Sequence, residues 1–249
     1  MSKPVPILSL RLLDIPIPAR PGDKQLLLTG AKDLLRTYKD RCEVAGVDIN
    51  LFHNKEVIYS GIQLSKYQSG SEWTAIGEEC VRALELWYLL FKETHPVQLE
   101  HVVEIREYYT PAFLPYHRFY QANALLISDV LARELNEIED NFRRMDRVER
   151  YIYGNLMTFF QYIGFEFNKD FHFLKVQVAD IGMYDKALPV FHSQKKTALR
   201  VHFKCNFRLP QNLRLGQSTA LGFGNIITVS GKKIKNQKYQ NDERKMSNF

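Results

Sequence analysis

The amino-acid sequence predicts an α+β fold. Over residues 1–110, short apolar segments of strand type alternate with two longer stretches in which apolar residues recur every three or four positions. In chain order these segments are strand, helix, strand, strand, helix and strand. Because this order is the split βαβ arrangement, we expect a ferredoxin-like domain in this half of the chain.

Local signals place the elements of this first half. Prolines bound the first apolar segment, and the helical spacing of leucines marks the first helix. Glu78 and Glu79 suit the start of the second helix, where acidic side chains favour the helix dipole. The expected elements are strand 7–15, helix 27–41, strands 46–53 and 57–67, a helix beginning at residue 78, and strand 101–109.

The second half is expected to form a separate domain. Residues 111–121 are rich in proline and aromatic side chains and are taken as its beginning, which gives domains 1–110 and 111–230 and a tail 231–249. The tail is basic and almost without apolar residues, so it is expected to be disordered when free. The other expected elements are helices 122–136 and 146–164 and strands 171–180 and 199–209.

The strand 199–209 alternates apolar and polar residues without a break. Its polar residues are all hydrogen-bond donors, and none is an acid. One face is therefore expected to be buried, and the other to present a row of donors: Arg200, His202, Lys204, Asn206 and Arg208. Such a face either binds a polyanion or is an ordinary solvated surface, and the pattern leaves both open.

Positive charge is concentrated near the end of the chain. The formal net charge is only +6, but residues 186–214 carry seven Lys and Arg and no acid. The last 64 residues carry +11, and the first 185 carry −5. This asymmetry points to a polyanionic partner, most commonly a nucleic acid.

A glycine-rich segment follows the basic strand. It holds Gly216, Gly222 and Gly224 and leads into the β-rich residues 226–229. Glycines permit positive φ and leave backbone N–H groups uncovered, so a loop of this type can bind phosphates, although it lacks the Lys of a Walker loop. The alternative is a tight turn without a ligand.

Cysteine usage suggests a reducing cytoplasm. Cys42, Cys80 and Cys205 are widely spaced and form no CxxC pair, so neither a disulfide framework nor a zinc site is expected. No segment is long and apolar enough for a membrane span, and Arg11 comes too early for a secretory signal. We expect no cofactor, no metal and no membrane partner.

Several motifs together resemble the CRISPR repeat-processing endoribonucleases of the RAMP superfamily. In the second half they are Leu-Gly-x5-Gly-Phe-Gly at 215–224, which is the most specific, Asn-Phe-Arg-Leu-Pro at 206–210 and Tyr-Gly-Asn at 153–155. In the first half they are Leu-Phe-His-Asn at 51–54, the Ile-Gln strand at 59–66 and the Ile-Gly turn at 76–77.

The resemblance implies two tandem ferredoxin-like domains that hold a CRISPR repeat RNA and cut it once without a metal. In that reaction the ribose 2′-OH attacks the adjacent phosphate and expels a 5′-OH, leaving a 2′,3′-cyclic phosphate. The alternative within the superfamily is a non-catalytic crRNA-binding subunit of an effector complex, with other effector subunits as partners. A generic RNA-binding scaffold is a third hypothesis.

The resemblance also suggests site residues. His53 stands at the family's histidine position and is expected to act in acid–base catalysis, and Lys55, where a second histidine is often found, to stabilise the phosphorane. Tyr38 is either a hydroxyl donor or, since it shares a helix face with leucines, part of the core. RNA contacts are expected from Lys195, Lys196, Arg200, His202, Lys204, Asn206, Arg208 and Arg214 and from the backbone around Gly216, Gly222 and Gly224.

Overall fold

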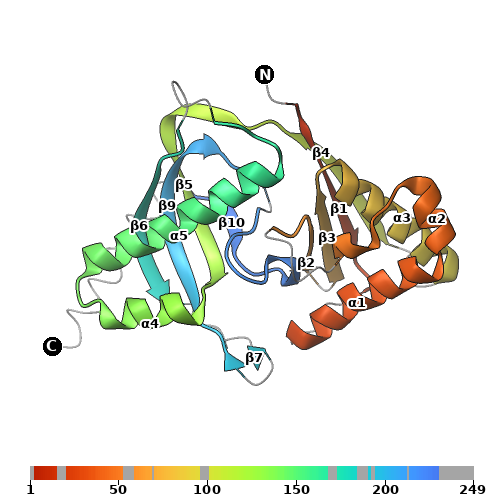
Figure 1. Cartoon of the computed structure of the whole chain (residues 1–249), viewed down its shortest axis with the longest axis horizontal. Coiled ribbons are helices and arrows are strands. Elements are labelled where there is room, and N and C mark those ends of the chain that lie inside the picture. Colours follow the sequence, from red (N-terminus) through yellow and green to blue (C-terminus); the bar gives the residue numbers. More distant parts are fainter. Residues whose placement is uncertain are drawn as a thin grey trace.

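The chain forms two four-stranded antiparallel sheets with helices packed on them (Figure 1). The fold is known from a computed structural model that describes residues 3–15, 21–52, 59–68, 70–95, 101–167, 173–183, 190–191, 194–211 and 213–229. The chain passes from the first sheet to the second between Tyr109 and Ala112. The α+β class predicted from the sequence is confirmed.

The first sheet has the strand order β2-β3-β1-β4, which is that of a ferredoxin-like domain. Helices α1 and α3 cover one face, where they bury the leucines of β1 and Trp73. The elements are β1 Val5–Leu12, α1 Pro21–Thr37, α2 Lys39–Ala45, the 3-10 helix η1 Ile49–Phe52, β2 Ile62–Tyr67, β3 Gly70–Ile76, α3 Glu78–Thr94 and β4 Val102–Tyr109.

The predicted strand at 46–53 is wrong. Gly46 ends α2 in the left-handed conformation, with φ of 62°, and residues 49–52 form η1, which buries Phe52. The hairpin partner of β2 is instead β3, and all seven residues of β3 are buried. A strand that is buried on both faces loses the alternation that would reveal it in the sequence.

The second sheet repeats the first with the order β10-β5-β9-β6, so the tandem ferredoxin-like fold is confirmed. A loop carrying the 3-10 helix η3 takes the place of the second helix. The elements are β5 Ala112–Leu126, α4 Asp129–Glu137, α5 Asn141–Tyr162, β6 Val176–Met183, β7 Val190–Phe191, β8 Gln194–Lys195, β9 Ala198–Arg208, η3 Thr219–Leu221 and β10 Asn225–Thr228.

The long strand β5 was not predicted: residues 111–121 were expected to form a domain boundary and residues 122–136 a helix. Its pairing with β9 shifts register between Phe113 and Arg118 and again between Ala122 and Leu125. Ala124 has φ of 49° at the second shift. These bulges break the period-two pattern, and the helix that follows begins only after its cap at Ser128.

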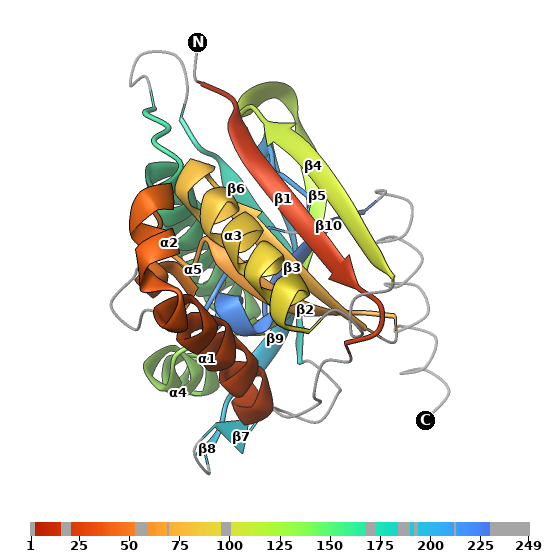
Figure 2. The same cartoon turned by 90° about the vertical axis from the view of Figure 1, so that its right-hand side faces the viewer.

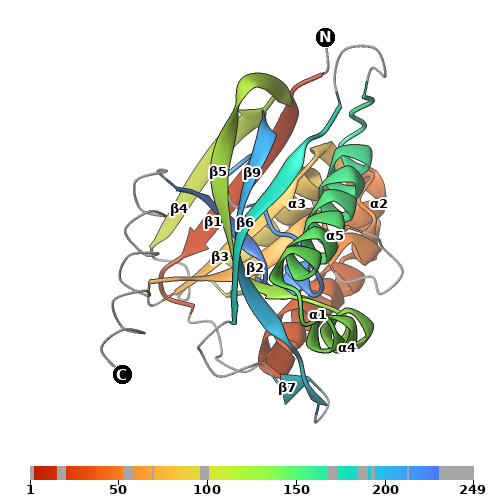
Figure 3. The same cartoon turned by 90° about the vertical axis from the view of Figure 1, so that its left-hand side faces the viewer.

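Aromatic side chains of α5 join the two halves. The Tyr162 hydroxyl donates to the Ile76 carbonyl oxygen at 2.7 Å. The Tyr59 ring lies 5.4 Å from that of Phe159 and 5.0 Å from that of Tyr162, measured between centroids. Figures 2 and 3, which view the molecule from opposite sides, show the helices gathered on one side and strands β1, β4 and β5 on the other.

The loop between β9 and β10 also bridges the halves. In Figure 2 its blue ribbon lies beside α1 and β2, and Leu221 is buried in the first-half core. The Lys24 ammonium of α1 donates to the Leu221 carbonyl oxygen at 3.1 Å. Among the described residues, no helix combines the length and the apolar character needed to cross a membrane.

Candidate functional site

Glycines in the β9–β10 loop allow it to pack tightly on neighbouring backbone. Gly216, Gly222 and Gly224 have φ of 88°, 83° and 73°. A Cβ at Gly216 would lie 2.6 Å from the Leu126 carbonyl oxygen, and one at Gly222 would lie 2.5 Å from that of Leu64. Both the positive φ and the close approach therefore require glycine at these positions.

The N–H groups of these glycines are not uncovered, contrary to the sequence-based expectation. Gly216 donates to Asn155 Oδ1 of α5 at 2.8 Å. Gly222 and Gly224 each donate to a backbone carbonyl oxygen at 3.0 Å. The prediction of free backbone donors at the three glycines is corrected, because the protein's own acceptors already occupy them.

Arg214 lies buried beneath this loop, with 1% of its surface exposed. Its Nη1 donates to Gln63 Oε1 at 2.6 Å, and Gln63 Nε2 donates to the Tyr59 hydroxyl at 3.0 Å. Burial lowers the pKa of the Arg214 guanidinium, and the negative charge of Glu72 opposes that shift. Arg214 was expected to be an RNA-contacting side chain; in the structure its Nη1 ties the loop to the first sheet, and a contact with RNA stays a prediction.

The polar face of β9 is not a continuous row of exposed donors. His202 and Asn206 are each 3% exposed. His202 Nδ1 lies 3.3 Å from Asp180 Oδ2, and its Nε2 lies 2.9 Å from Gln121 Oε1. The Asn206 side chain bonds to backbone groups just before β6. The expectation of exposed donors is therefore wrong at both positions, because the neighbouring chain supplies their partners.

The Asp180–His202 pair predicts a loss of stability in acid. The hydrogen bond to His202 holds the pKa of Asp180 below its ordinary value. A carboxylate of this kind stabilises the fold above its unfolded pKa of about 3.9, and the stabilisation is lost as the pH falls through the folded value. Between about pH 5 and pH 3, Asp180→Asn should therefore lose less stability than the wild type in urea unfolding. Equal losses in the two proteins would contradict this.

The other predicted basic contacts differ in their exposure. Arg208 is exposed, Lys204 is half-buried over an aromatic ring of β5 at 5.0 Å, and Arg200 is half-buried. Lys196 pairs with an acidic side chain of α4 at 2.7 Å. The side chain of Lys195 lies outside the described residues. Arg208 and Arg118 line a polar cleft of about 500 Å³ between the ends of the two sheets.

Two of the three predicted catalytic residues, His53 and Lys55, lie outside the described residues. The described chain stops at Phe52, which is buried in the first-half core, and resumes at Tyr59, which packs on α5. Tyr38 is half-buried at the junction of α1 and α2 and packs against that core. This placement favours the structural alternative for Tyr38, while its part in a reaction stays a prediction.

A cavity of about 370 Å³ lies where α5, the loop and Tyr59 meet; we call it the α5 cavity. Its described lining includes Arg147, Arg150 and Arg214 and no acidic residue. Arg147 and Arg150 were not predicted from the sequence as site residues. Cations spaced by three residues share a helix face, so the sequence does contain a pattern that predicts a basic patch at Arg147 and Arg150. The pattern was overlooked because the first 185 residues have a net negative charge.

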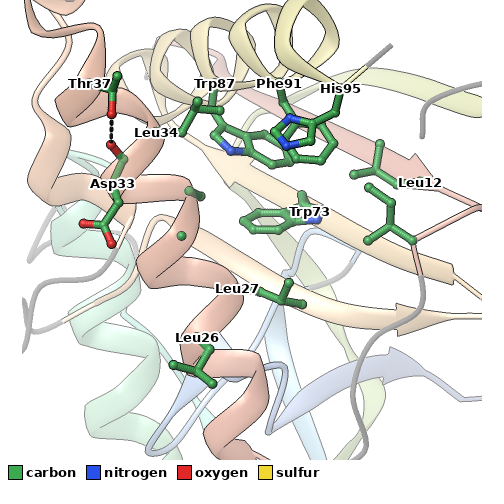
Figure 4. A pocket seen from close by; sticks show the side chains of 13 residues that line it. Leu12, Leu26, Leu27, Asp33, Leu34, Thr37, Trp73, Trp87, Phe91 and His95 are labelled. Atoms are coloured by element: carbon green, nitrogen blue, oxygen red, sulfur yellow. Dashed lines mark hydrogen bonds between the residues drawn. The ribbon is translucent and has the colours of Figure 1, made fainter. Parts of the chain in front are cut away.

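A second cavity, of about 430 Å³, lies between α1, α3 and the first sheet (Figure 4). Trp73, Trp87 and Phe91 form a stack on its wall, with ring centroids 4.4 Å and 5.3 Å apart. Asp33 is the one Asp, Glu, Lys or Arg among the described residues that line it. An apolar wall and a carboxylate do not suit a polyanion, so this cavity is not part of the candidate site.

Among the comparisons with known proteins, a family match was found for the second half of the chain. Residues 114–229 match the Cas6b C-terminal domain family. No curated protein matches the chain in sequence.

Solved structures match over nearly the whole chain. A Cas6b crystal structure has a TM-score of 0.69 at 19% identity, with 91% of this chain and 100% of that one covered. The structure of the CRISPR RNA processing endoribonuclease Cas6b has a TM-score of 0.62 at 16% identity, with 91% of this chain and 100% of that one covered. Csf5, a type IV Cas6 crRNA endonuclease, has a TM-score of 0.54 at 16% identity, with 92% of this chain and 100% of that one covered. The resemblance to the CRISPR repeat-processing family is therefore confirmed: residues 114–229 match the Cas6b C-terminal domain, and the chain has the fold of the Cas6b structures.

Proposed function

We propose that the chain is a metal-independent endoribonuclease that cleaves CRISPR repeat RNA and so produces mature crRNA. The observation that carries this proposal is the match of residues 114–229 to the Cas6b C-terminal domain. The α5 cavity supports it, because three arginines line a concavity at the junction of the two halves. A cytoplasmic location and contacts with other effector subunits belong to the same proposal.

The proposed reaction needs only groups that the chain can supply. The 2′-OH oxygen attacks the adjacent phosphorus while a base takes its proton. The bond from phosphorus to O5′ breaks, the electron pair leaves on O5′, and an acid protonates it, giving 2′,3′-cyclic phosphate and 5′-OH ends. We assign the acid–base role to His53 and stabilisation of the phosphorane charge to Lys55. Tyr38 is kept as the candidate hydroxyl donor, although its packing favours a place in the core.

The test is incubation of the purified chain with the repeat RNA of its own CRISPR array in the presence of EDTA. A single cut with a cyclic phosphate end is expected. Tight binding without cleavage would instead favour a non-catalytic crRNA-binding subunit, and cleavage only with added Mg²⁺ would overturn metal independence. Absence of both binding and cleavage would overturn the RNA proposal as a whole.

Removal of the three remaining β9 cations, Arg200, Lys204 and Arg208, is expected to weaken RNA binding and flatten its salt dependence. A plot of log K for RNA binding against log salt concentration has a negative slope. Each lost phosphate contact should reduce the magnitude of that slope by about 0.7–0.9. The measurement is RNA titration at several salt concentrations.

The matched control removes three exposed cations from first-half helices, Arg36, Lys39 and Lys92, and so changes the net charge equally. An unchanged slope in the β9 variant, or equal changes in both variants, would remove β9 from the RNA interface.

A further inference from the structure

A glycine stands in the middle of α5, a helix of 22 residues, without a visible internal reason. Gly154 is exposed, and a Cβ added there would meet no described atom within 4 Å. Glycine within a helix is less favourable than alanine, because it gives up more backbone freedom. At Gly216 and Gly222 neighbouring backbone excludes a side chain, whereas at Gly154 no described part of the protein does.

Gly154 lines the α5 cavity together with Arg147 and Arg150. These arginines precede it by seven and four residues, so all three lie on one face of the helix. Arg147 pairs with Glu134 at 2.6 Å and Arg150 with Asp146 at 2.8 Å. Both pairs are solvent-exposed and therefore weak, and a guanidinium has five N–H donors, so each arginine can also bind a phosphate.

Arg214 contributes a buried donor to the same cavity. The side chain lines it and is 1% exposed, and its Nε has no hydrogen-bond partner within the described protein. A buried donor without a partner is unfavourable, and an oxygen atom entering the cavity can satisfy it. The α5 cavity is therefore lined by two arginines of α5, by the buried Nε of Arg214 and by helix backbone without a side chain at Gly154.

From this arrangement we infer that the α5 cavity binds a single unpaired nucleotide of the RNA strand. Arg147 and Arg150 hold its phosphate, and its ribose lies against the helix at Gly154. The volume of about 370 Å³ falls within the range of about 300–1,000 Å³ typical of small-ligand sites. The inference rests on the proposed RNA substrate and adds to it the place where one nucleotide leaves the base stack.

Gly154→Ala tests this inference because stability and binding should change in opposite directions. The added methyl group favours the helix, so Tm is expected to rise by about 1–4 °C. The same methyl group occupies the space assigned to the ribose, so the affinity for the repeat RNA should fall about tenfold. Gly30→Ala in α1 is the matched control, since that glycine is also helical and exposed, with open space around its Cβ position. It should raise Tm equally and leave RNA affinity unchanged.

The outcomes separate this inference from the proposed function when AMP is used as a second probe. Unchanged RNA affinity in Gly154→Ala, with wild-type cleavage intact, would overturn the inference alone. A wild type that does not cut RNA, with weaker binding of a short RNA by Gly154→Ala, would overturn the cleavage proposal and support the site. If Gly154→Ala weakens AMP binding but not RNA binding, the site takes free nucleotides, and the assignment to the RNA strand is wrong.

Discussion

His53→Ala is expected to slow cleavage of the repeat RNA by about 10²–10⁴-fold, the usual contribution of general acid–base catalysis. An imidazole titrates near neutral pH, so it can accept the 2′-OH proton or donate one to O5′. RNA binding should remain close to that of the wild type, because the phosphates are assigned to other cations. Single-turnover cleavage with all RNA bound separates the chemical step from affinity.

His101→Ala is the control for this variant. His101 is exposed at the edge of the first sheet, where its Nδ1 lies 3.2 Å from Asp14 Oδ1, and its replacement should leave the cleavage rate unchanged. Wild-type cleavage by His53→Ala would place the acid–base group elsewhere. Loss of RNA binding together with cleavage would indicate that His53 supports the structure and does not act on the reacting atoms.

The pattern of apolar and polar residues predicted those helices and strands whose own sequence shows which face is buried. Helices α3 and α5 have apolar stripes, and β4 and β9 were predicted close to their observed positions. The strand β3 was missed because Glu72 and Thr74 are polar yet buried. Glu72 is held by Arg11 Nε at 2.8 Å across the sheet, a partner 61 residues away that no local window contains.

In the candidate site, too, the local sequence could not show which polar groups have partners elsewhere in the chain. Alternation along β9 identified its donors, but it could not tell solvent from partners on neighbouring strands, and His202 is paired with Asp180. The glycines were predicted from their ability to adopt positive φ, which they do adopt, but their N–H groups are used internally. Whether a polar group faces water depends on chain packing, which one strand's sequence does not encode.

Arg214→Ala is expected to reduce the free energy of unfolding by about 3 kcal/mol, since it removes a buried hydrogen bond to a charged group and leaves a cavity. Gln63 Oε1 would lose its 2.6 Å donor inside the protein. The loop would also lose a tie to the first sheet, although Lys24 still donates to the Leu221 carbonyl oxygen. Urea unfolding measures the change, and Arg208→Ala, at an exposed position, should change stability by less than about 0.5 kcal/mol.

Arg214→Met separates the two causes of the loss. Methionine refills much of the volume with a flexible apolar chain but offers no donor to Gln63, so its stability should lie between those of Arg214→Ala and the wild type. If Met and Ala variants are equally unstable, the buried hydrogen bond accounts for the whole effect and packing for none. If Arg214→Ala is as stable as Arg208→Ala, the guanidinium does not hold the loop. Contact with the nucleotide in the α5 cavity would then be the role left for Arg214.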